Sequence, residues 1–159
     1  MANLKQNTSV ALQVLKSDNA NIPYPARVVS GTNTSATTNK LIDSGATFVT
    51  NNVMQNDIIY NITDGSAATV VSVDSETQIT LNADIFTAGS KEYIVYSGQN
   101  VNNGCLLWVG GSGTVKVDTA GGQTVSITAP IGILGGTAPL NITKVYSSTT
   151  TATLMVALW

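Results

Sequence analysis

The side chains that could carry chemistry in this chain are few. Among its 159 residues there are no His, one Cys, nine Asp and Glu, and seven Lys and Arg. Enzymes assemble their sites from these types, because such groups transfer protons, bind metals or stabilise charge. The polar residues are instead mainly Thr, Ser, Asn and Gly, whose hydroxyls and amides form hydrogen bonds but do not titrate. We therefore expect a β-rich structural protein with no catalytic residues, not an enzyme.

Four acidic residues recur at short intervals in the middle of the chain, at Asp57, Asp64, Asp74 and Asp84. Carboxylates at such spacing could bind Ca²⁺, but no stretch has the spacing of an EF-hand loop. Asp also begins turns, and we favour that role. A glycan depolymerase would need two carboxylates about 5 to 10 Å apart, and nothing in the spacing of the acids supports one. We predict no metal site and no cofactor.

Two other motifs could each indicate either a functional site or an ordinary structural feature. Cys105 precedes an apolar run, and without a His to activate it we predict a small buried hydrophobe. The stretch 110–113, Gly-Gly-Ser-Gly, resembles part of a phosphate loop, but no Lys-Ser/Thr pair follows it. We predict that it forms a hairpin turn.

The charge and hydropathy patterns indicate whether the chain binds nucleic acid, a membrane or other subunits. The basic residues are scattered, so we expect no binding to nucleic acid. No stretch approaches 18 apolar residues, which argues against a membrane span, and no secretory signal is visible, so we expect synthesis in the cytoplasm. A net charge of -2 with 43% hydrophobic residues favours a subunit of an assembly over a free monomer.

The first predicted region, residues 1–34, reads as an extended arm. It holds a short apolar run at residues 10–15 and then two prolines, which favour extended backbone. Residues 30–39 read as a polar linker. We predict contacts with other subunits of an assembly at six residues of this arm and of the C-terminal region: Ile22, Pro23, Tyr24, Pro25, Trp108 and Trp159. Trp159 should pack under a neighbouring strand or against a partner subunit.

The second region, residues 35–98, is predicted to be a small β-barrel or a meander. Short strands are expected at residues 57–63, 67–73, 78–81 and 91–96. Asp64-Gly65 predicts a type I′ hairpin turn between the first two, because that turn needs positive φ at both central positions.

The third region, residues 99–159, is predicted to be an antiparallel β-sandwich that forms the oligomer. Clean alternation places Val115 and Val117 inward, and likewise Val125, Ile127 and Ala129. The expected strands are residues 105–109, 114–119, 123–129, 140–146 and 152–158. The whole chain is therefore expected to be all-β.

Residues 99–159 contain Leu107-Trp108-Val109-Gly110, Gly113-Thr114-Val115-Lys116-Val117 and Ala120-Gly121-Gly122-Gln123-Thr124-Val125, and near the end Thr150-Thr151-Ala152-Thr153 followed by Val156-Ala157-Leu158-Trp159. These motifs resemble the capsid spike-base proteins of tailed phages and gene-transfer agents. A second set is similar to a small β-module that recurs in phage structural proteins: Leu41-Ile42-Asp43-Ser44, Asp57-Ile58-Ile59-Tyr60-Asn61 and Asp84-Ile85-Phe86.

The resemblance implies a virion structural protein on the exterior of a phage head, made in a bacterial cytoplasm. Its implied partners are the major capsid protein, further copies of itself and, where it forms a spike base, a spike or fibre protein. The six predicted contact residues would then make oligomer or capsid contacts. A pentamer would suit a fivefold vertex, and a trimer would suit decoration at a local threefold. The alternative is a receptor- or glycan-binding module of a tail fibre or baseplate, because aromatic residues and Asn-rich loops could bind glycans.

Overall fold

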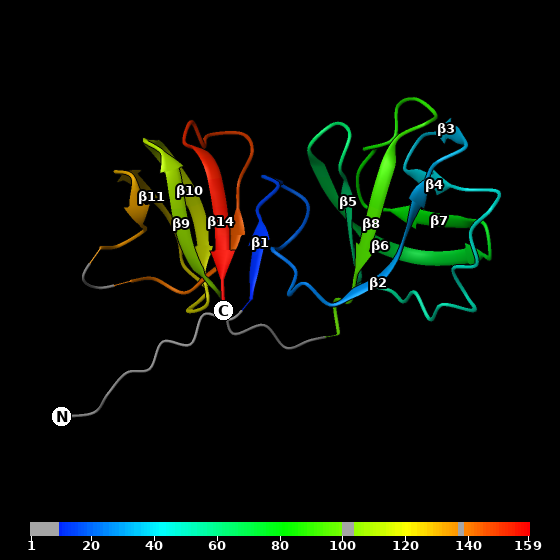
Figure 1. The fold of residues 1–159 in the computed structure, drawn as a ribbon, viewed down its shortest axis with the longest axis horizontal. Helices are drawn as coiled ribbons and strands as arrows, with labels where there is room; N and C mark the ends of the chain where they lie inside the picture. The colour runs from blue at the N-terminus through cyan, green and yellow to red at the C-terminus, as the bar shows by residue number, and fades with distance from the viewer. Residues whose placement is uncertain (1–9, 100–103, 137–138) are drawn as a thin grey trace.

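The computed structural model describes residues 10–99, 104–136 and 139–159, and throughout these ranges the chain is all-β, with 49% strand and no helix. Figure 1 shows two β units with the strand β1 between them. Residues 1–9 of the predicted arm, 100–103 of the third region, and 137–138 lie outside the described residues. The expected fold class is confirmed.

The larger unit is an antiparallel seven-stranded sheet in the order β2-β8-β5-β6-β7-β4-β3. Its strands are β2 (Arg27–Thr32), β3 (Ser35–Thr37), β4 (Lys40–Ile42), β5 (Ile58–Asn61), β6 (Ser66–Ser75), β7 (Gln78–Leu81) and β8 (Glu92–Tyr96). The first half of the long strand β6 pairs with β5 in regular register, and its second half pairs with β7, where the register shifts after Val70 and after Val73. The sheet does not close into a barrel, and only β5, β6 and β7 follow one another as a meander.

A buried aromatic and aliphatic core holds this unit together. Phe48, Phe86 and Tyr93 pack with aliphatic side chains from β4, β5, β6, β7 and β8. The hydroxyl of Tyr93 donates a hydrogen bond of 2.8 Å to Oδ2 of Asp43, and both residues are buried. A buried polar group costs free energy unless it is paired, so this bond makes the central tyrosine compatible with the core.

The hairpin between β5 and β6 differs from the predicted type I′ turn. Its loop has four residues, 62–65, and Gly65 has a φ of 68° whereas Asp64 does not have a positive φ. Asn61 explains the difference, because its Oδ1 accepts a bond from the Asp64 N–H and its carbonyl accepts one from the Gly65 N–H. The side chain of Asn61 thus ends the strand earlier than the sequence pattern suggests.

The second unit is sandwich-like, with a four-stranded sheet in the order β1-β14-β9-β12 and a three-stranded sheet in the order β11-β10-β13. The strands are β1 (Ala11–Gln13), β9 (Leu106–Gly111), β10 (Gly113–Thr119), β11 (Thr124–Ala129), β12 (Gly132–Ile133), β13 (Ile142–Val145) and β14 (Thr153–Leu158). One core contains residues of both sheets: Leu107, Val109, Met155 and Ala157 from the first, and Val115, Val117, Ile142 and Val145 from the second.

The stretch 110–113 is a corner between these two sheets, so the predicted hairpin is wrong. Strand β9 ends at Gly111 and β10 begins at Gly113, but the first pairs with β12 and β14 and the second with β11 and β13. A Cβ at Gly113 would lie 2.7 Å from the backbone nitrogen of Ala152. The backbone at this corner therefore lies too close to the segment around Ala152 to leave room for a side chain. Close approach, and not hairpin chemistry, explains this glycine.

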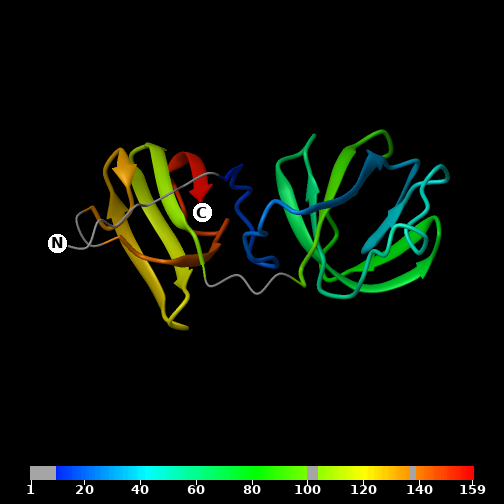
Figure 2. The same ribbon diagram turned by 60° about the horizontal axis from the view of Figure 1, so that its bottom comes forward.

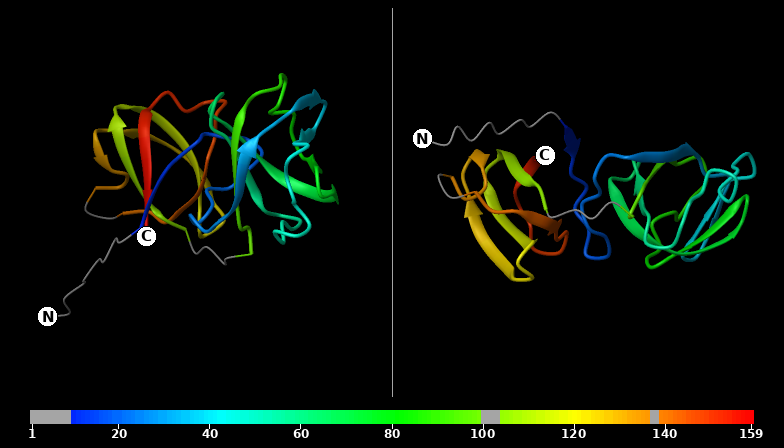
Figure 3. Two further views of the ribbon diagram at one scale, coloured as in Figure 1. Left: turned by 45° about the vertical axis from the view of Figure 1, so that its right-hand side comes forward. Right: turned by 90° about the horizontal axis from the view of Figure 1, so that it is seen from below.

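Residues 10–24, which we call the strap, lie between the two units (Figures 1, 2 and 3). On the sandwich side, β1 pairs with β14, and the backbone nitrogens of Val14, Ser17 and Ile22 donate to carbonyls of the sandwich at 2.8 to 2.9 Å. On the other side, the Ser17 hydroxyl donates to the Ala67 carbonyl at 2.7 Å, and the Asn19 carbonyl accepts two further bonds. The strap is therefore bonded to both units.

Apolar packing accompanies these bonds. Leu12 and Leu15 of the strap pack against a small buried cluster that includes Tyr60 and Tyr96 of the larger unit. The predicted arm, residues 1–34, thus has two structural roles, because residues 27–32 are not part of the strap but form strand β2. The polar linker predicted at residues 30–39 is wrong, since most of it lies in β2 and β3.

Candidate functional site

The acidic residues singled out in the sequence mostly hold turns. The buried carboxylate of Asp57 accepts bonds from the backbone nitrogens of Met54 and Gly98, at 2.9 and 2.8 Å. Asp84 accepts one from the backbone of Asn39. Asp74 lies instead within β6, where hydrogen bonds from Gln78 and Lys40 lower its pKa.

The side chains that could bind a metal ion or act as nucleophiles are spread apart in the structure. Within residues 10–99, 104–136 and 139–159, no three His, Cys, Asp or Glu side chains are grouped as metal ligands would be. Cys105 is buried, as predicted, and its Sγ lies 3.3 Å from the carbonyl oxygen of Ile142. Burial raises the pKa of this thiol to about 12, so it is not poised as a nucleophile. No helix that could cross a membrane occurs in the described ranges.

The six predicted contact residues do not form one surface. Ile22 and Pro23 are buried in the strap, with Ile22 in the core of the sandwich. Trp159 packs against that core within its own chain, and its ring lies 5.5 Å from the ring of Tyr24. Trp108 lies apart from them, on the opposite face of the four-stranded sheet from the core. Of the six, it is the one whose large apolar side chain is exposed.

We call the solvent side of the four-stranded sheet the outer face. Side chains alternate between the faces of a strand, and Leu107, Val109, Met155 and Ala157 point into the core. Their neighbours point outward, and in register Ile133 lies beside Trp108, which lies beside Val156. The outer face consists of Leu106, Trp108 and Gly110 of β9, Leu154, Val156 and Leu158 of β14, Ile133 of β12, and Ala11 and Gln13 of β1.

Trp108 and Leu154 form the most prominent part of the outer face. Their exposed fractions are 38% and 70%. The indole ring lies over Gly110, where a Cβ would come within 2.7 Å of it and within 3.0 Å of the Cβ of Leu154. Leu154 has a φ of 53°, which a leucine rarely adopts. An apolar residue is thus kept exposed in a strained backbone conformation, a combination that is typical of functional positions.

The outer face is apolar and uncharged. None of the four strands that form it contains Asp, Glu, Lys or Arg. Antiparallel sheets with one solvated face normally alternate between apolar and polar residues, whereas sheets covered on both faces read as continuous apolar runs. This sheet has the second pattern although Trp108 and Leu154 on its outer face are exposed and the apolar residues beside them are only partly buried. The arrangement is suited to docking against another apolar surface.

Most residues of the outer face were not predicted from the sequence to be contact residues. Leu154, Val156 and Ile133 were not among the predicted contacts, although the signal for two of them was visible. Residues 105–109 and 154–159 are continuous apolar runs, while the strand at residues 114–119 alternates. A strand with apolar residues on both faces in an otherwise alternating sandwich indicates a second buried surface. Comparisons of the chain with protein-family models, with curated proteins and with solved structures found no match.

Proposed function

We propose that this chain is a non-enzymatic structural subunit of a phage virion, placed on the head exterior. There it forms a symmetric oligomer that cements or decorates the capsid, or forms the base of a vertex spike or fibre. The observation that carries the proposal is the uncharged outer face, on which the large apolar side chains of Trp108 and Leu154 are exposed. The phage setting rests on the motif resemblance in residues 99–159.

Burial of the outer face supplies a driving force for association. Apolar surface removed from water contributes about 25 cal/mol per Å², and exposed Trp residues in the middle of a patch are frequent anchors of interfaces. The sheet could pack face to face with a second sheet, as the two layers of a sandwich do. A charged partner surface would gain nothing here, because the outer strands hold no charge to pair with it.

The size of the outer face suggests how it is used. Strands about 4.8 Å apart with about 3.3 Å per residue give roughly 270 Å² for a face made by the 17 residues of these four strands. A standard stable interface buries about 800 Å² per partner. The face alone is therefore too small for a tight isolated dimer. It fits a subunit that is held by several contacts at once, as in a closed ring or on a capsid lattice.

Native mass spectrometry of the purified chain over a range of concentrations tests this proposal. The informative variant is Leu154→Asn, because Asn tolerates positive φ and removes the exposed apolar side chain. The control is Val49→Asn, which changes a residue of similar exposure in the other unit. We expect the wild type and V49N to form the same closed oligomer, and L154N to shift to monomer.

The stoichiometry separates the positions on the particle. A pentamer would place the chain at fivefold vertices, and a trimer would favour cementing or decoration. Co-sedimentation of the wild type and L154N with heads of the encoding phage extends the test to assembly on the capsid surface. If the wild type stays monomeric at all concentrations and does not sediment with heads, the proposal is wrong, and the glycan- or receptor-binding alternative takes its place.

A further inference from the structure

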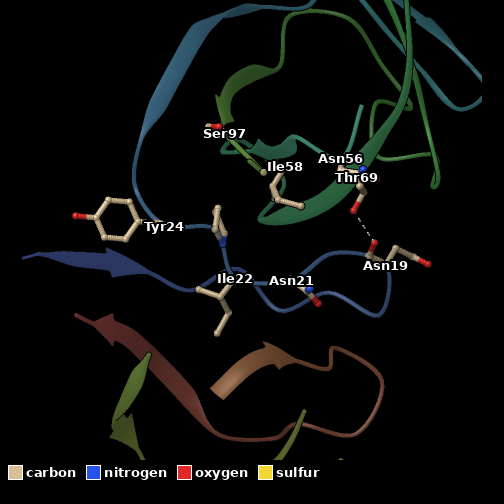
Figure 4. A pocket seen from close by; sticks show the side chains of 10 residues that line it. Asn19, Asn21, Ile22, Tyr24, Asn56, Ile58, Thr69 and Ser97 are labelled. Carbon is tan, nitrogen blue, oxygen red and sulfur yellow. Dashed lines mark hydrogen bonds between the residues drawn. The ribbon is translucent and has the colours of Figure 1, made fainter. Parts of the chain in front are cut away.

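A cavity of about 450 Å³ opens between the strap and the larger unit. Figure 4 shows the ring of Tyr24 at one end and Asn56 and Thr69 at the other, with Ile58 above and Asn21 and Ile22 below. Its walls come from the strap, the start of β5, the middle of β6 and the residues that follow β8. The volume lies in the range of about 300 to 1,000 Å³ that is usual for small-molecule sites.

The walls of the cavity are fixed by bonds behind them. The carboxylate of Asp57, which is 1% exposed, accepts hydrogen bonds from the backbone at Met54 and Gly98 and so ties two wall segments together. On the strap side, the hydroxyl of Thr69 donates to the carbonyl of Asn19 at 3.1 Å, the bond drawn in Figure 4. Sites held in this way are organised before a ligand arrives.

The lining is polar but uncharged. Amides come from Asn19, Asn21 and Asn56, and hydroxyls come from Thr69 and Ser97, while no Asp, Glu, Lys or Arg lines the cavity. A phosphate, carboxylate or cation would be desolvated here without an opposite charge, which is unfavourable. Amides and hydroxyls instead match a ligand that both donates and accepts hydrogen bonds without net charge.

From this lining we infer that the cavity binds a neutral carbohydrate. The amides of Asn21 and Asn56 can each donate to and accept from sugar hydroxyls. Pro23 and Ile58 provide the apolar surface against which the C–H face of a pyranose packs, whereas the ring of Tyr24 points away from the cavity and contacts Trp159. The inference does not depend on the proposed virion role, since the cavity lies at the strap and the outer face lies on the sandwich.

An array of immobilised oligosaccharides tests the inference, with neutral chains built on glucose, galactose, mannose and N-acetylglucosamine beside sialylated and uronic-acid chains. The informative variants are Asn56→Gly and Asn21→Ala. Asn56 has a φ of 72°, so Gly removes its amide without imposing strain. Asn52→Gly is the matched control, because Asn52 also has a positive φ, 56°, but does not line the cavity.

We expect the wild type and N52G to bind at least one class of neutral oligosaccharide, and N56G and N21A to bind it about tenfold more weakly, as the loss of hydrogen bonds to the ligand predicts. The inference is overturned if no neutral oligosaccharide is bound, if binding is confined to the acidic chains, or if all four proteins bind equally. None of these results bears on the oligomeric state, which native mass spectrometry measures, so the two proposals fail separately.

Discussion

The ring of Tyr24 meets the ring of Trp159 edge to face, with centroids 5.5 Å apart and planes at 74°. Residues from near the two ends of the chain are thereby brought together at the end of the strap. The backbone adds to this, because the nitrogen of Trp159 donates to the carbonyl of Val10 at 3.0 Å. From the sequence, Trp159 was expected to pack either under a neighbouring strand or against a partner subunit. In the structure it packs within its own chain, where it holds the strap against the sandwich.

Replacement of Trp159 by Ala should therefore destabilise the protein by about 2 to 3 kcal/mol, somewhat less than for a fully buried Trp. Urea unfolding followed by circular dichroism measures this. A double-mutant cycle with Tyr24→Leu should give a coupling energy of about 0.5 to 1.5 kcal/mol for the ring contact. Additive effects of the two substitutions would show that the rings are neighbours without mutual stabilisation.

Gly98 should tolerate no side chain. A Cβ there would overlap the backbone carbonyl of Asn56, which Asp57 and its bonds hold in place. Gly98→Ala should cost at least about 2 kcal/mol, as overpacking against backbone does. Gly121→Ala is the control, since the nearest atom to its Cβ is a threonine hydroxyl at 3.7 Å, and it should change stability by less than about 0.5 kcal/mol. Equal effects in thermal unfolding would contradict this.

Because the backbone at Leu154 is strained, we expect that replacing this residue stabilises the protein. Replacing an exposed apolar residue with Asn is normally neutral, but the φ of 53° costs a leucine about 1 kcal/mol that Asn largely avoids. Leu154→Asn should therefore raise the free energy of unfolding by up to about 1 kcal/mol under conditions where the wild type is dissociated. A lower stability of L154N at low protein concentration would mean that Leu154 has an intramolecular role instead.

Alkaline pH should unfold the protein through Tyr60. Its hydroxyl is buried near the backbone of Leu15 but makes no hydrogen bond of normal geometry, and burial raises its pKa well above 10, an effect that the Leu15 backbone only partly offsets. The folded state keeps this proton while the unfolded state loses it above pH about 10, so stability is full below that pH and then falls by up to about 1.4 kcal/mol per pH unit. Cys105, with its pKa raised to about 12, adds a similar loss beginning near pH 8.5.

Tyr60→Phe isolates the contribution of that hydroxyl. Because the removed group is buried and unbonded, stability at pH 7 should be unchanged or higher. The decline above pH 10 should become shallower than in the wild type, as measured by urea midpoints between pH 7 and 11. A wild-type decline that persists in full would assign it to Tyr93 and Tyr96, whose pKa values burial also raises.

The sequence predicts the sandwich better than the parts around it. Alternation at residues 114–119 and 124–129 depends on neighbouring residues only, so the strands and the inward Val115 and Val117 could be read directly. The strap could not, because its partners in β14 and β6 are distant in sequence. The corner at Gly113 and the Asn61 turn likewise depend on contacts that no local pattern encodes.

The pairing of β1 with β14 also has a consequence for the order of synthesis. The strap leaves the ribosome early, but the strand that it must pair with is completed only when residues 153–158 have been made. The larger unit can fold before then, whereas the sandwich waits for β14, and contacts of such long sequence separation form slowly. A chain cut short before residue 153 would leave the strap without β14 as its partner and the outer face without its central strand. Completion of the sandwich thereby distinguishes chains that contain β14 from shorter fragments.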